Sequence, residues 1–409
     1  MAITLFTNIS ELVTNRGVAK KGGVGVTEDD LGIIRDGALL WDSKKGILWM
    51  GFADDVPKKL IRSAKKVSLK NKILTPALAD CHTHLVFAGS RHAEFKQKLE
   101  GATYQQIAAS GGGITSSVKA TRKAPEAELY QSAIKRIEHC ISLGVGILEI
   151  KSGYGLDWPT ERKMLRVIAK LKKAYRGKIL IQATFLGAHD FPPEATTARL
   201  KIAYATKVAD EMLPQVKKEK LADACDIFMD EGYYTRSQAR RILQKAHALG
   251  FDIKLHADEL ANTGGAALAA DLGALSADHL LKADEAGINR MAARGVTAVL
   301  LPTTAFYLGI PYASVAKMRK AGICFAIASD FNPGSSPSLH LPFAMSLACL
   351  QMKMTTAEAF AATTYGGARA LGLHNQNGCL RVGGKPKIAI FDCPSYSCLI
   401  SQYAYPGMC

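Results

Sequence analysis

The sequence lacks the long apolar runs, the signal segment and the cysteine framework of membrane and secreted proteins. No uninterrupted apolar stretch approaches the roughly 18 residues that a membrane-spanning helix requires. The first residues reach polar Thr7 and Asn8 without a basic start or a long apolar core, unlike a secretory signal. The nine cysteines have the spacing of neither a zinc ribbon nor a disulfide framework. These absences predict a cytoplasmic protein with reduced thiols and no membrane partner.

Aromatic and acidic residues are also scarce, which bears on nucleic-acid binding. Phe, Trp and Tyr make up 7% of the chain, and 52 Lys and Arg outnumber 36 Asp and Glu, giving a net charge of +16. The lysine pairs are scattered along the whole chain and are not interleaved with aromatic residues in one block. The pattern favours a solvated basic surface, so we expect no nucleic-acid partner.

The chain is too long to be one small module. Its 409 residues exceed the usual size of a compact domain, and 48% of them are hydrophobic while 22% are charged. This balance supplies apolar side chains for a sizeable core and differs from the low hydrophobicity of disordered chains. We expect one large architecture, or a main domain with a smaller companion.

Both ends of the sequence predict short β-strands. Between residues 26 and 74, alternating runs such as 38–41 are separated by turn residues, and residues 378–392 have the same character. We interpret these segments as two parts of one small β-sandwich domain, made of residues 1–74 and 373–409.

Between these ends, short apolar segments alternate with longer helical patterns, which is typical of βα units around a parallel sheet. Eight such units in residues 75–372 predict an α/β fold of the TIM-barrel, (β/α)8, type. The candidate strands are residues 78–82, 146–150, 179–186, 225–229, 252–256, 275–278, 296–300 and 324–328. Functional side chains are expected at the C-terminal ends of these strands, because the active-site face of such a barrel lies there.

Residues that commonly bind metals occupy three of those strand ends. His82 and His84 close the first strand, where alternation sends both imidazoles to the same side. His256 ends the fifth strand and Asp330 ends the eighth. A lone His or Asp at a strand end is usually a satisfied polar residue, but four in register with the sheet predict a metal centre. Three imidazoles and a carboxylate suit Zn²⁺ or Fe²⁺ better than Mg²⁺ or Ca²⁺ and leave a position for water.

Two further residues near strand ends are interpreted as non-ligating. His279 ends the sixth strand, but no obvious bridging carboxylate accompanies it as a ligand of a second metal. We assign it to accept the proton of the attacking water, the alternative being a core histidine bonded to the backbone. Lys151 lies near the end of the second strand, and we expect it to stand beside a centre with one metal ion.

A series of short motifs, in order along nearly the whole chain, resembles the imidazolonepropionase family of the amidohydrolase superfamily. The motifs are residues 75–84 (TPALADCHTH), 87–91 (FAGSR) with Glu94 and Phe95, 111–114 (GGGI), 151–156 (KSGYGL), 186–189 (LGAH), 256–259 (HADE), 329–335 (SDFNPGS) and 364–368 (TYGGA). Each is weak alone, and together they are specific. One departure is Pro386-Lys387, where related chains typically have Ala-Asp, and it puts the terminal β region in question rather than the site.

The resemblance implies hydrolysis of 4-imidazolone-5-propanoate, a cyclic amide with a propionate tail, to N-formimidoyl-L-glutamate. Arg91 would offer its guanidinium fork to the tail carboxylate, the alternative being a surface arginine. Tyr154 would donate its hydroxyl to the same end, unless its Gly-flanked segment is merely a turn. Asn332, Gly334 and Ser335 resemble the family's other substrate contacts.

The resemblance also implies roles for residues around the ring. His189 would contact the ring carbonyl region and help to hold the developing oxyanion. Glu259 would accept a hydrogen bond from a ring N–H and pass a proton, and Asp330 would protonate the departing ring nitrogen. Residues 111–113 would form a loop or lid near the site, and we expect a homodimer.

Three other functions fit parts of the sequence. Another cyclic amidase or ring-base deaminase of the same superfamily would use the metal scaffold, but a base without a carboxylate tail has no use for Arg91 and Tyr154. A nucleic-acid-binding protein would explain the net charge, and its affinity would fall steeply with ionic strength. A structural metal protein without turnover is hard to reconcile with an open coordination position.

Overall fold

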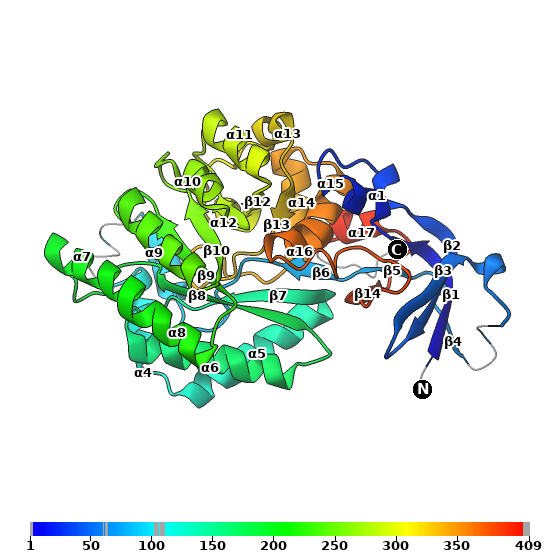
Figure 1. Cartoon of the computed structure of the whole chain (residues 1–409), viewed down its shortest axis with the longest axis horizontal. Coiled ribbons are helices and arrows are strands. Elements are labelled where there is room, and N and C mark those ends of the chain that lie inside the picture. Colours follow the sequence, from blue (N-terminus) through cyan, green and yellow to red (C-terminus); the bar gives the residue numbers. More distant parts are fainter. Residues whose placement is uncertain (1–2, 60, 62–63, 102–105, 107–110, 404–409) are drawn as a thin grey trace.

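The computed structural model describes residues 3–59, 61, 64–101, 106 and 111–403 (Figure 1). Its larger part is a parallel eight-stranded sheet in which every strand pairs with the next along the chain. The strands are β6 (Leu78–Asp80), β7 (Val145–Lys151), β8 (Leu180–Ala188), β9 (Ala224–Met229), β10 (Asp252–Ala257), β11 (Ser276–His279), β12 (Thr297–Leu300) and β13 (Phe325–Ile327). All eight segments predicted as barrel strands are confirmed.

The first and last strands of this sheet come together just beyond their C-terminal ends. Thr83 forms a parallel bridge with Phe331, and the backbone N–H of His84 donates to the carbonyl of Phe331 at 2.8 Å. Deeper in the sheet, the Asp80 carboxylate accepts hydrogen bonds from the backbone N–H and the hydroxyl of Ser329. The sheet is therefore a nearly closed barrel, and residues after β6 and after β13 share one side of its mouth.

Helices surround the barrel, between consecutive barrel strands and after the last one, β13 (Figure 1). They are α2 (His92–Leu99), α4 (Ile114–Lys123), α5 (Glu126–Ser142), α6 (Trp158–Ala174), α7 (Ala198–Lys207), α8 (Leu213–Glu219), α9 (Arg236–Ala248), α10 (Gly265–Leu272), α11 (Glu285–Arg294), α12 (Pro302–Leu308), α13 (Val315–Ala321), α14 (Leu341–Met352), α15 (Thr356–Ala361) and α16 (Gly367–Ala370), with π-helical turns at Val208–Met212 and Ala362–Gly366. Helix α6 shows how the sequence specifies such a helix. Asp157 caps it by accepting the N–H of Thr160, and Met164, Leu165 and Ile168 are buried at helical spacing.

The two ends of the chain form one small β domain, as predicted. Its strands are β1 (Ile3–Leu12), β2 (Ile34–Asp42), β3 (Gly46–Phe52), β4 (Lys65–Ser68), β5 (Ile73–Pro76) and β14 (Ile388–Phe391), with the short helices α1 (Arg16–Lys20) and α17 (Tyr396–Ser401) nearby. They form one mixed sheet in the order β14-β5-β1-β2-β3, and β4 also pairs with β1. The larger buried cluster of this sheet consists of Ile9, Leu12, Ile34, Leu39, Ile47, Leu69, Leu74 and Leu380, and a smaller one of Leu5, Ala38 and Leu40.

The C-terminal strand joins the N-terminal part of the domain despite the unusual Pro-Lys pair before it. β14 runs antiparallel to β5, with Ile390 opposite Leu74, and the carbonyl of Lys387 accepts the N–H of Ala77. The terminal β region is therefore formed. The exact boundaries at residues 74 and 372 stay a prediction.

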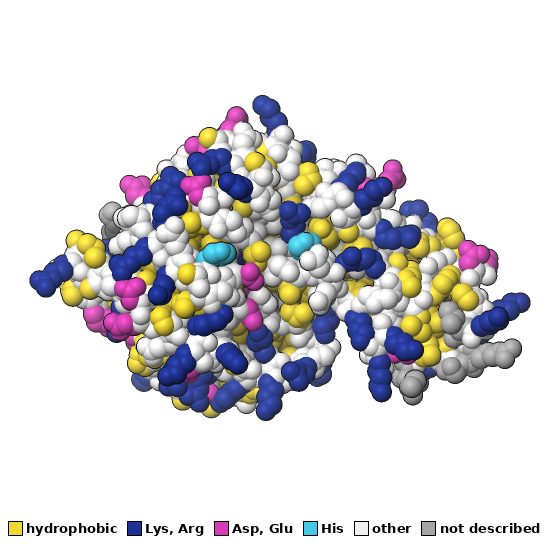
Figure 2. All heavy atoms as spheres, viewed as in Figure 1, with side chains coloured by type: hydrophobic (Ala, Val, Ile, Leu, Met, Phe, Trp, Pro, Cys, Tyr) yellow, Lys and Arg dark blue, Asp and Glu magenta, His cyan; other side chains and the backbone are white. Residues whose placement is uncertain are grey.

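Basic side chains are spread over the surface. Figure 2 shows Lys and Arg over the whole visible face of both parts of the molecule, with acidic side chains between them. Several of these cations are paired, for example Arg319 with Glu358 at 2.8 Å. Within the described residues, no helix is both long and apolar enough to cross a bilayer.

Candidate metal centre and active site

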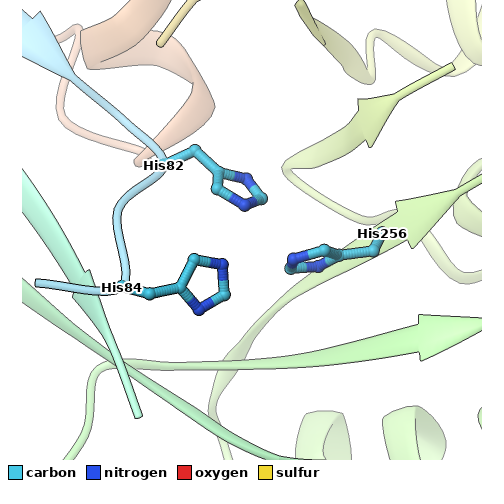
Figure 3. Close-up of side chains that lie close together, drawn as sticks. All are labelled: His82, His84 and His256. Atoms are coloured by element: carbon cyan, nitrogen blue, oxygen red, sulfur yellow. The ribbon is translucent and has the colours of Figure 1, made fainter. Parts of the chain in front are cut away.

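Three histidines converge at the barrel mouth. His82 and His84 follow β6, and His256 lies near the end of β10; their rings face one another across a small space (Figure 3). One ring nitrogen from each lies within 4.8 Å of the others, and each residue is at most 3% exposed. The structure thus brings together the three imidazoles that the sequence predicted as metal ligands.

Asp330 completes this group from the opposite end of the barrel sheet. Its Oδ1 lies 3.4 Å from Nε2 of His82 and 3.6 Å from Nε2 of His84, while its Oδ2 accepts a 2.6 Å hydrogen bond from the hydroxyl of Thr304 on α12. The backbone of Asp330 has φ 50°, in the left-handed region. A non-glycine residue there is costly unless its surroundings hold it, and such strain is concentrated at functional sites.

The histidine nitrogens fit a metal ion. Nε2 of His82, Nδ1 of His84 and Nε2 of His256 are buried without a hydrogen-bond partner, a costly arrangement unless something binds them. Burial lowers the pKa of His82 and of His84 well below the ordinary value, which leaves the neutral imidazoles that ligate metals. A carboxylate beside these lone pairs adds the negative charge that a divalent cation requires.

A group of fully buried charges lies beneath the histidines. Lys151 Nζ is 2.6 Å from Asp226 Oδ2 and 3.0 Å from Glu149 Oε2, and Lys254 Nζ is 2.7 Å from Glu149 Oε2. Although burial opposes the charged form, Asp226 and Glu149 raise the pKa of Lys151. Its ammonium is therefore paired with carboxylates. That Lys151 is not a metal ligand stays a prediction. The number of metal ions stays a prediction.

His279 lies at the end of β11 with an open nitrogen. Its Nδ1 is buried without a hydrogen-bond partner and its Nε2 is 3.5 Å from Oε2 of Glu259, so it is not a core histidine bonded to the backbone. A backbone φ of 76° ends the strand alternation at this residue, which turns its ring toward those of His82 and His256, with centroids 5.5 and 5.3 Å away. Burial lowers the pKa of His279 well below the ordinary value, so the ring is neutral.

Glu259 stands beside His279 on a loop that a second carboxylate holds. Both oxygens of Asp230 accept backbone N–H groups, from Glu259 at 2.8 Å, Leu260 at 2.9 Å and Ala261 at 3.0 Å. Burial, followed by the charges of Asp330 and Asp230, raises the pKa of Glu259 to about 8. A carboxyl group with such a pKa exchanges protons readily near neutral pH.

These groups open into a cavity of about 550 Å³. It is lined by nearly all of the predicted site residues, namely His84, Arg91, Tyr154, His189, His256, Glu259, His279, Asp330, Asn332, Gly334 and Ser335, whereas the buried His82 is not among the lining residues. Apolar side chains of α2 and α12 form the outer wall, where Phe95 stacks on Tyr307. Ile114, directly after residues 111–113, also lines the cavity, while the lid role of that loop stays a prediction.

Arg91 lines the cavity but is already paired. Its Nε and Nη2 each lie 2.8 Å from Oε2 of Glu94, and its side chain is 18% exposed, so it is not a surface arginine. The guanidinium has five N–H groups, and the edge formed by Nη1 and Nη2 still offers a two-pronged contact to a carboxylate. A Cβ at position 334 would collide with this guanidinium, so Gly334 lets the loop after β13 approach Arg91.

Tyr154 sits on a loop that wraps around the carboxylate of Glu161 from α6. Glu161 Oε1 accepts the N–H of Gly155 at 2.7 Å and of Leu156 at 3.2 Å, and both of its oxygens accept the N–H of Gly153. The loop after β7 is therefore fixed by a buried anion rather than being a free turn. Burial raises the pKa of Tyr154, which keeps its hydroxyl protonated as a donor.

His189 has a tautomer set by its surroundings. Its Nδ1 lies 3.0 Å from the carbonyl of Gly153, an oxygen that can only accept, so Nδ1 carries the proton. Burial lowers the pKa of His189 to about 3, which leaves Nε2 with a lone pair. Its ring stacks on His84 with centroids 4.9 Å apart. This tautomer accepts a hydrogen bond at Nε2, so the predicted contact to an oxyanion would require protonation of His189.

Asn332 organises the turn after Asp330. Its Nδ2 donates to the carbonyl of Asp330 at 2.7 Å, and its Oδ1 accepts the N–H of Gly334 at 2.8 Å and of Ser335 at 2.7 Å. The amide atoms predicted to contact substrate are thus engaged in the turn itself. The predicted contacts of these residues to substrate stay a prediction.

Sequence reasoning did not identify the buried carboxylates that support the site. Asp226 and Asp278 contact His256 and His82, and Asp230 and Glu161 hold the two loops described above. The sequence does hold one signal for such groups. Charged or ionisable residues stand two positions apart within apolar strands, as Lys254 and His256 do, and the alternation of side chains along a strand directs both into the barrel interior.

Comparison with known proteins identifies the family of this chain. The amidohydrolase family matches residues 73–405. A curated imidazolonepropionase of Geobacillus kaustophilus (strain HTA426) is 43% identical over 396 residues, which cover 96% of this chain and 92% of the relative. The chain belongs to the imidazolonepropionase family of amidohydrolases. An imidazolonepropionase of Bdellovibrio bacteriovorus is 41% identical, covering 95% of this chain and 90% of that relative.

Solved structures of amidohydrolase-type enzymes share the fold. A 5-methylcytosine deaminase from Klebsiella pneumoniae superimposes with a TM-score of 0.71 at 16% identity, covering 98% of this chain and 94% of the other. An adenosine deaminase from Xanthomonas campestris with bound zinc gives 0.66 at 19% identity, with 96% and 85% covered. At this identity the likeness shows the barrel with its companion domain alone.

Proposed function

We propose that this protein is a metal-dependent imidazolonepropionase that opens the ring of 4-imidazolone-5-propanoate to give N-formimidoyl-L-glutamate. One observation carries the proposal: neutral histidines, a carboxylate and an arginine line the same cavity. The chain also has curated relatives that are named imidazolonepropionase. The cavity holds groups for both ends of the substrate. The histidine cluster faces the reacting ring, and Arg91 faces the propionate.

The metal would be held by His82, His84, His256 and Asp330, as one Zn²⁺ or Fe²⁺ per chain. Such an ion supplies Lewis-acid activation of water and of the ring carbonyl. The unpartnered nitrogens and the neutral state of the buried rings support this assignment.

Proton transfer would begin at His279. Its neutral ring accepts a proton from the attacking water as the new C–O bond forms at the ring carbonyl carbon. Oε2 of Glu259 lies 3.5 Å from Nε2 of His279. Glu259 accepts a hydrogen bond from a ring N–H of the substrate and transfers a proton. Asp330, whose Oδ1 lies 3.4 Å from Nε2 of His82, would protonate the ring nitrogen as the C–N bond breaks.

The substrate would be oriented by contacts at both ends. The free edge of Arg91 binds the propionate carboxylate, and the Tyr154 hydroxyl donates to it. His189 accepts a ring N–H at Nε2, a role that follows from the proton on its Nδ1. Asn332, Gly334 and Ser335 border the same end and complete the substrate site through the loop after β13.

The test is metal content together with loss of imidazolonepropionate absorbance when the purified protein is added. Bound metal with turnover supports the proposal, whereas bound metal without turnover on this substrate retains the scaffold and rejects the substrate. Cytosine serves as a ring base without a tail, and turnover of cytosine alone would favour a deaminase.

We propose that the protein is a cytoplasmic homodimer and that it binds no nucleic acid. The spread of basic side chains over the surface supports the absence of nucleic-acid binding. Light scattering during size-exclusion chromatography measures the mass, and a gel shift at low and high salt tests the absence of nucleic-acid affinity.

A further inference from the structure

The buried charges beneath the histidines contact two of the three imidazoles directly. Asp278 Oδ2 lies 2.6 Å from Nδ1 of His82, and Asp226 Oδ2 lies 3.0 Å from Nδ1 of His256. Both carboxylates are fully buried, so they occupy fixed positions inside the barrel. Nδ1 of His84 has no hydrogen-bond partner, and Nδ1 of His256, although 3.0 Å from Asp226 Oδ2, also forms no hydrogen bond. His82 is thus hydrogen-bonded to a carboxylate, whereas His256 stands next to one without a hydrogen bond.

A carboxylate at Nδ1 decides which nitrogen of a histidine can bind a metal. A carboxylate oxygen only accepts, so the proton of a neutral ring lies on Nδ1 and the lone pair on Nε2. Nε2 of His82 and Nε2 of His256 are buried without a hydrogen-bond partner, and a ring nitrogen of each lies within 4.8 Å of one of His84. The carboxylate of Asp278 therefore directs the lone pair of His82 toward the proposed metal position, and Asp226, 3.0 Å from Nδ1 of His256, is placed to do the same for His256.

Lys151 links these two carboxylates. Its Nζ is 2.6 Å from Asp226 Oδ2 and 3.6 Å from Asp278 Oδ2, the same oxygens that face the two histidines. Lys254, which donates to the carbonyl of Cys81 at 2.8 Å, lies 3.7 Å from the same oxygen of Asp278. The Lys151 ammonium thus links Asp226 on β9 with Asp278 on β11, the two strands on either side of β10.

The group also leaves a negative charge under the site. Two ammonium groups face three carboxylates, those of Glu149, Asp226 and Asp278. Buried charges without full compensation are unfavourable.

We propose that Asp226 and Asp278 are positioning residues that fix the tautomers of His256 and His82, and that Lys151 couples the two. The inference rests on the proposed metal centre and specifies which buried groups determine its affinity. None of the three touches the cavity, so their effect reaches the reaction through the histidines. Lys151 acts here as a structural cation and not as a bridging ligand.

The experiment measures the Zn²⁺ dissociation constant of the full chain by competition with a chelator, without substrate. Asp278→Asn keeps the shape and removes the charge, and we expect binding about 10- to 100-fold weaker. Asp226→Asn makes the same change beside Nδ1 of His256, and we expect a loss of affinity by a similar factor. An unchanged dissociation constant in both variants would overturn the inference.

The matched control is Thr184→Val. The Thr184 hydroxyl donates to Glu149 Oε1 at 2.5 Å, so it belongs to the same buried group but contacts no histidine. We expect its dissociation constant to stay within about twofold of the parent value while its melting temperature falls. Equal loss of metal affinity in this control would indicate general damage to the barrel and would also overturn the inference.

A second measurement does not depend on the variants folding. Nitrogen-15 chemical shifts of labelled histidines in the metal-free parent protein report the protonated nitrogen, and we expect Nδ1–H for His82 and His256. Protonation at Nε2 would contradict the inference. Because neither measurement uses substrate, absence of imidazolonepropionate turnover would reject the proposed function and leave this result standing.

Discussion

The barrel mouth and the small β domain bury their interiors in opposite ways. The domain core under β1 and β2 consists of Leu and Ile side chains. The barrel interior beneath the mouth instead holds Lys151, Lys254 and three carboxylates at no measurable exposure. The first arrangement stabilises a fold by removing apolar surface from water. The second costs desolvation energy and is retained where it prepares a chemical site.

Because the two interiors differ, we expect substitutions in the two regions to affect activity and stability differently. Changes in the barrel mouth are expected to reduce activity more than stability, and changes in the small domain the reverse. Each of the following variants tests one side of that comparison.

The largest effect is expected at His279. His279→Asn removes the proton acceptor, while Asn tolerates the left-handed backbone of this position. We expect kcat to fall by a factor of about 10² to 10⁴, the usual contribution of a positioned base. Metal analysis should show unchanged content, because His279 is not a proposed ligand. Turnover equal to that of the parent would remove it from the mechanism.

In the small domain, Leu39→Ala should act on stability alone. Leu39 is fully buried on β2, and truncating such a side chain costs about 2 to 5 kcal/mol. Denaturant unfolding measures the loss, and kcat at a temperature where the variant remains folded should stay within about twofold. A large fall in kcat would show that the domain contributes to the reaction, and the contrast between the two regions would fail.

Arg91 is expected to separate substrate binding from chemistry. Arg91→Ala removes a charge-assisted contact of about 1.5 to 3 kcal/mol, so KM should rise roughly 10- to 100-fold with little change in kcat. Arg91→Lys keeps the charge but loses the two-pronged edge, and it should fall between the parent and the alanine variant. An unaltered KM in both variants would reject Arg91 as the binding group for the tail.

The smallest effect concerns acid stability and His189. Burial holds the pKa of His189 near 3, whereas the unfolded chain takes up this proton at about pH 6.5. Below pH 6.5 only the unfolded state is protonated there, so stability falls as the pH falls, by about 1 kcal/mol per pH unit. His189→Gln should lack this part of the slope between pH 6.5 and 5 in metal-free protein. Equal slopes for the parent and the variant would contradict a neutral buried ring.

Much of the fold could be predicted because its signals are local. Apolar runs bounded by turn residues located all eight barrel strands, and the chemistry-bearing residues at their ends identified the histidine cluster with Asp330. In a parallel barrel, strand ends meet at one face, so position in sequence was enough to bring His82 and Asp330 together.

Other features of the site depend on partners far apart in the chain. Nothing in the sequence around Lys151 shows that its ammonium donates a hydrogen bond to Asp226, 75 residues away. Strand periodicity does not report side-chain rotamers. It therefore could not predict that Arg91 pairs with Glu94 or that Asn332 forms a turn. The tautomer of His189 likewise follows from one carbonyl oxygen across a loop.

The carboxylates of Glu161 and Asp230 affect how this site can change by mutation during evolution. Each holds its loop through backbone N–H groups, which every residue except proline possesses. The side chains carried by those loops, including Tyr154 and Leu260, are therefore exchangeable without loss of the loop shape. A barrel built in this way can acquire a new ring or tail preference by single substitutions while its loops keep their paths.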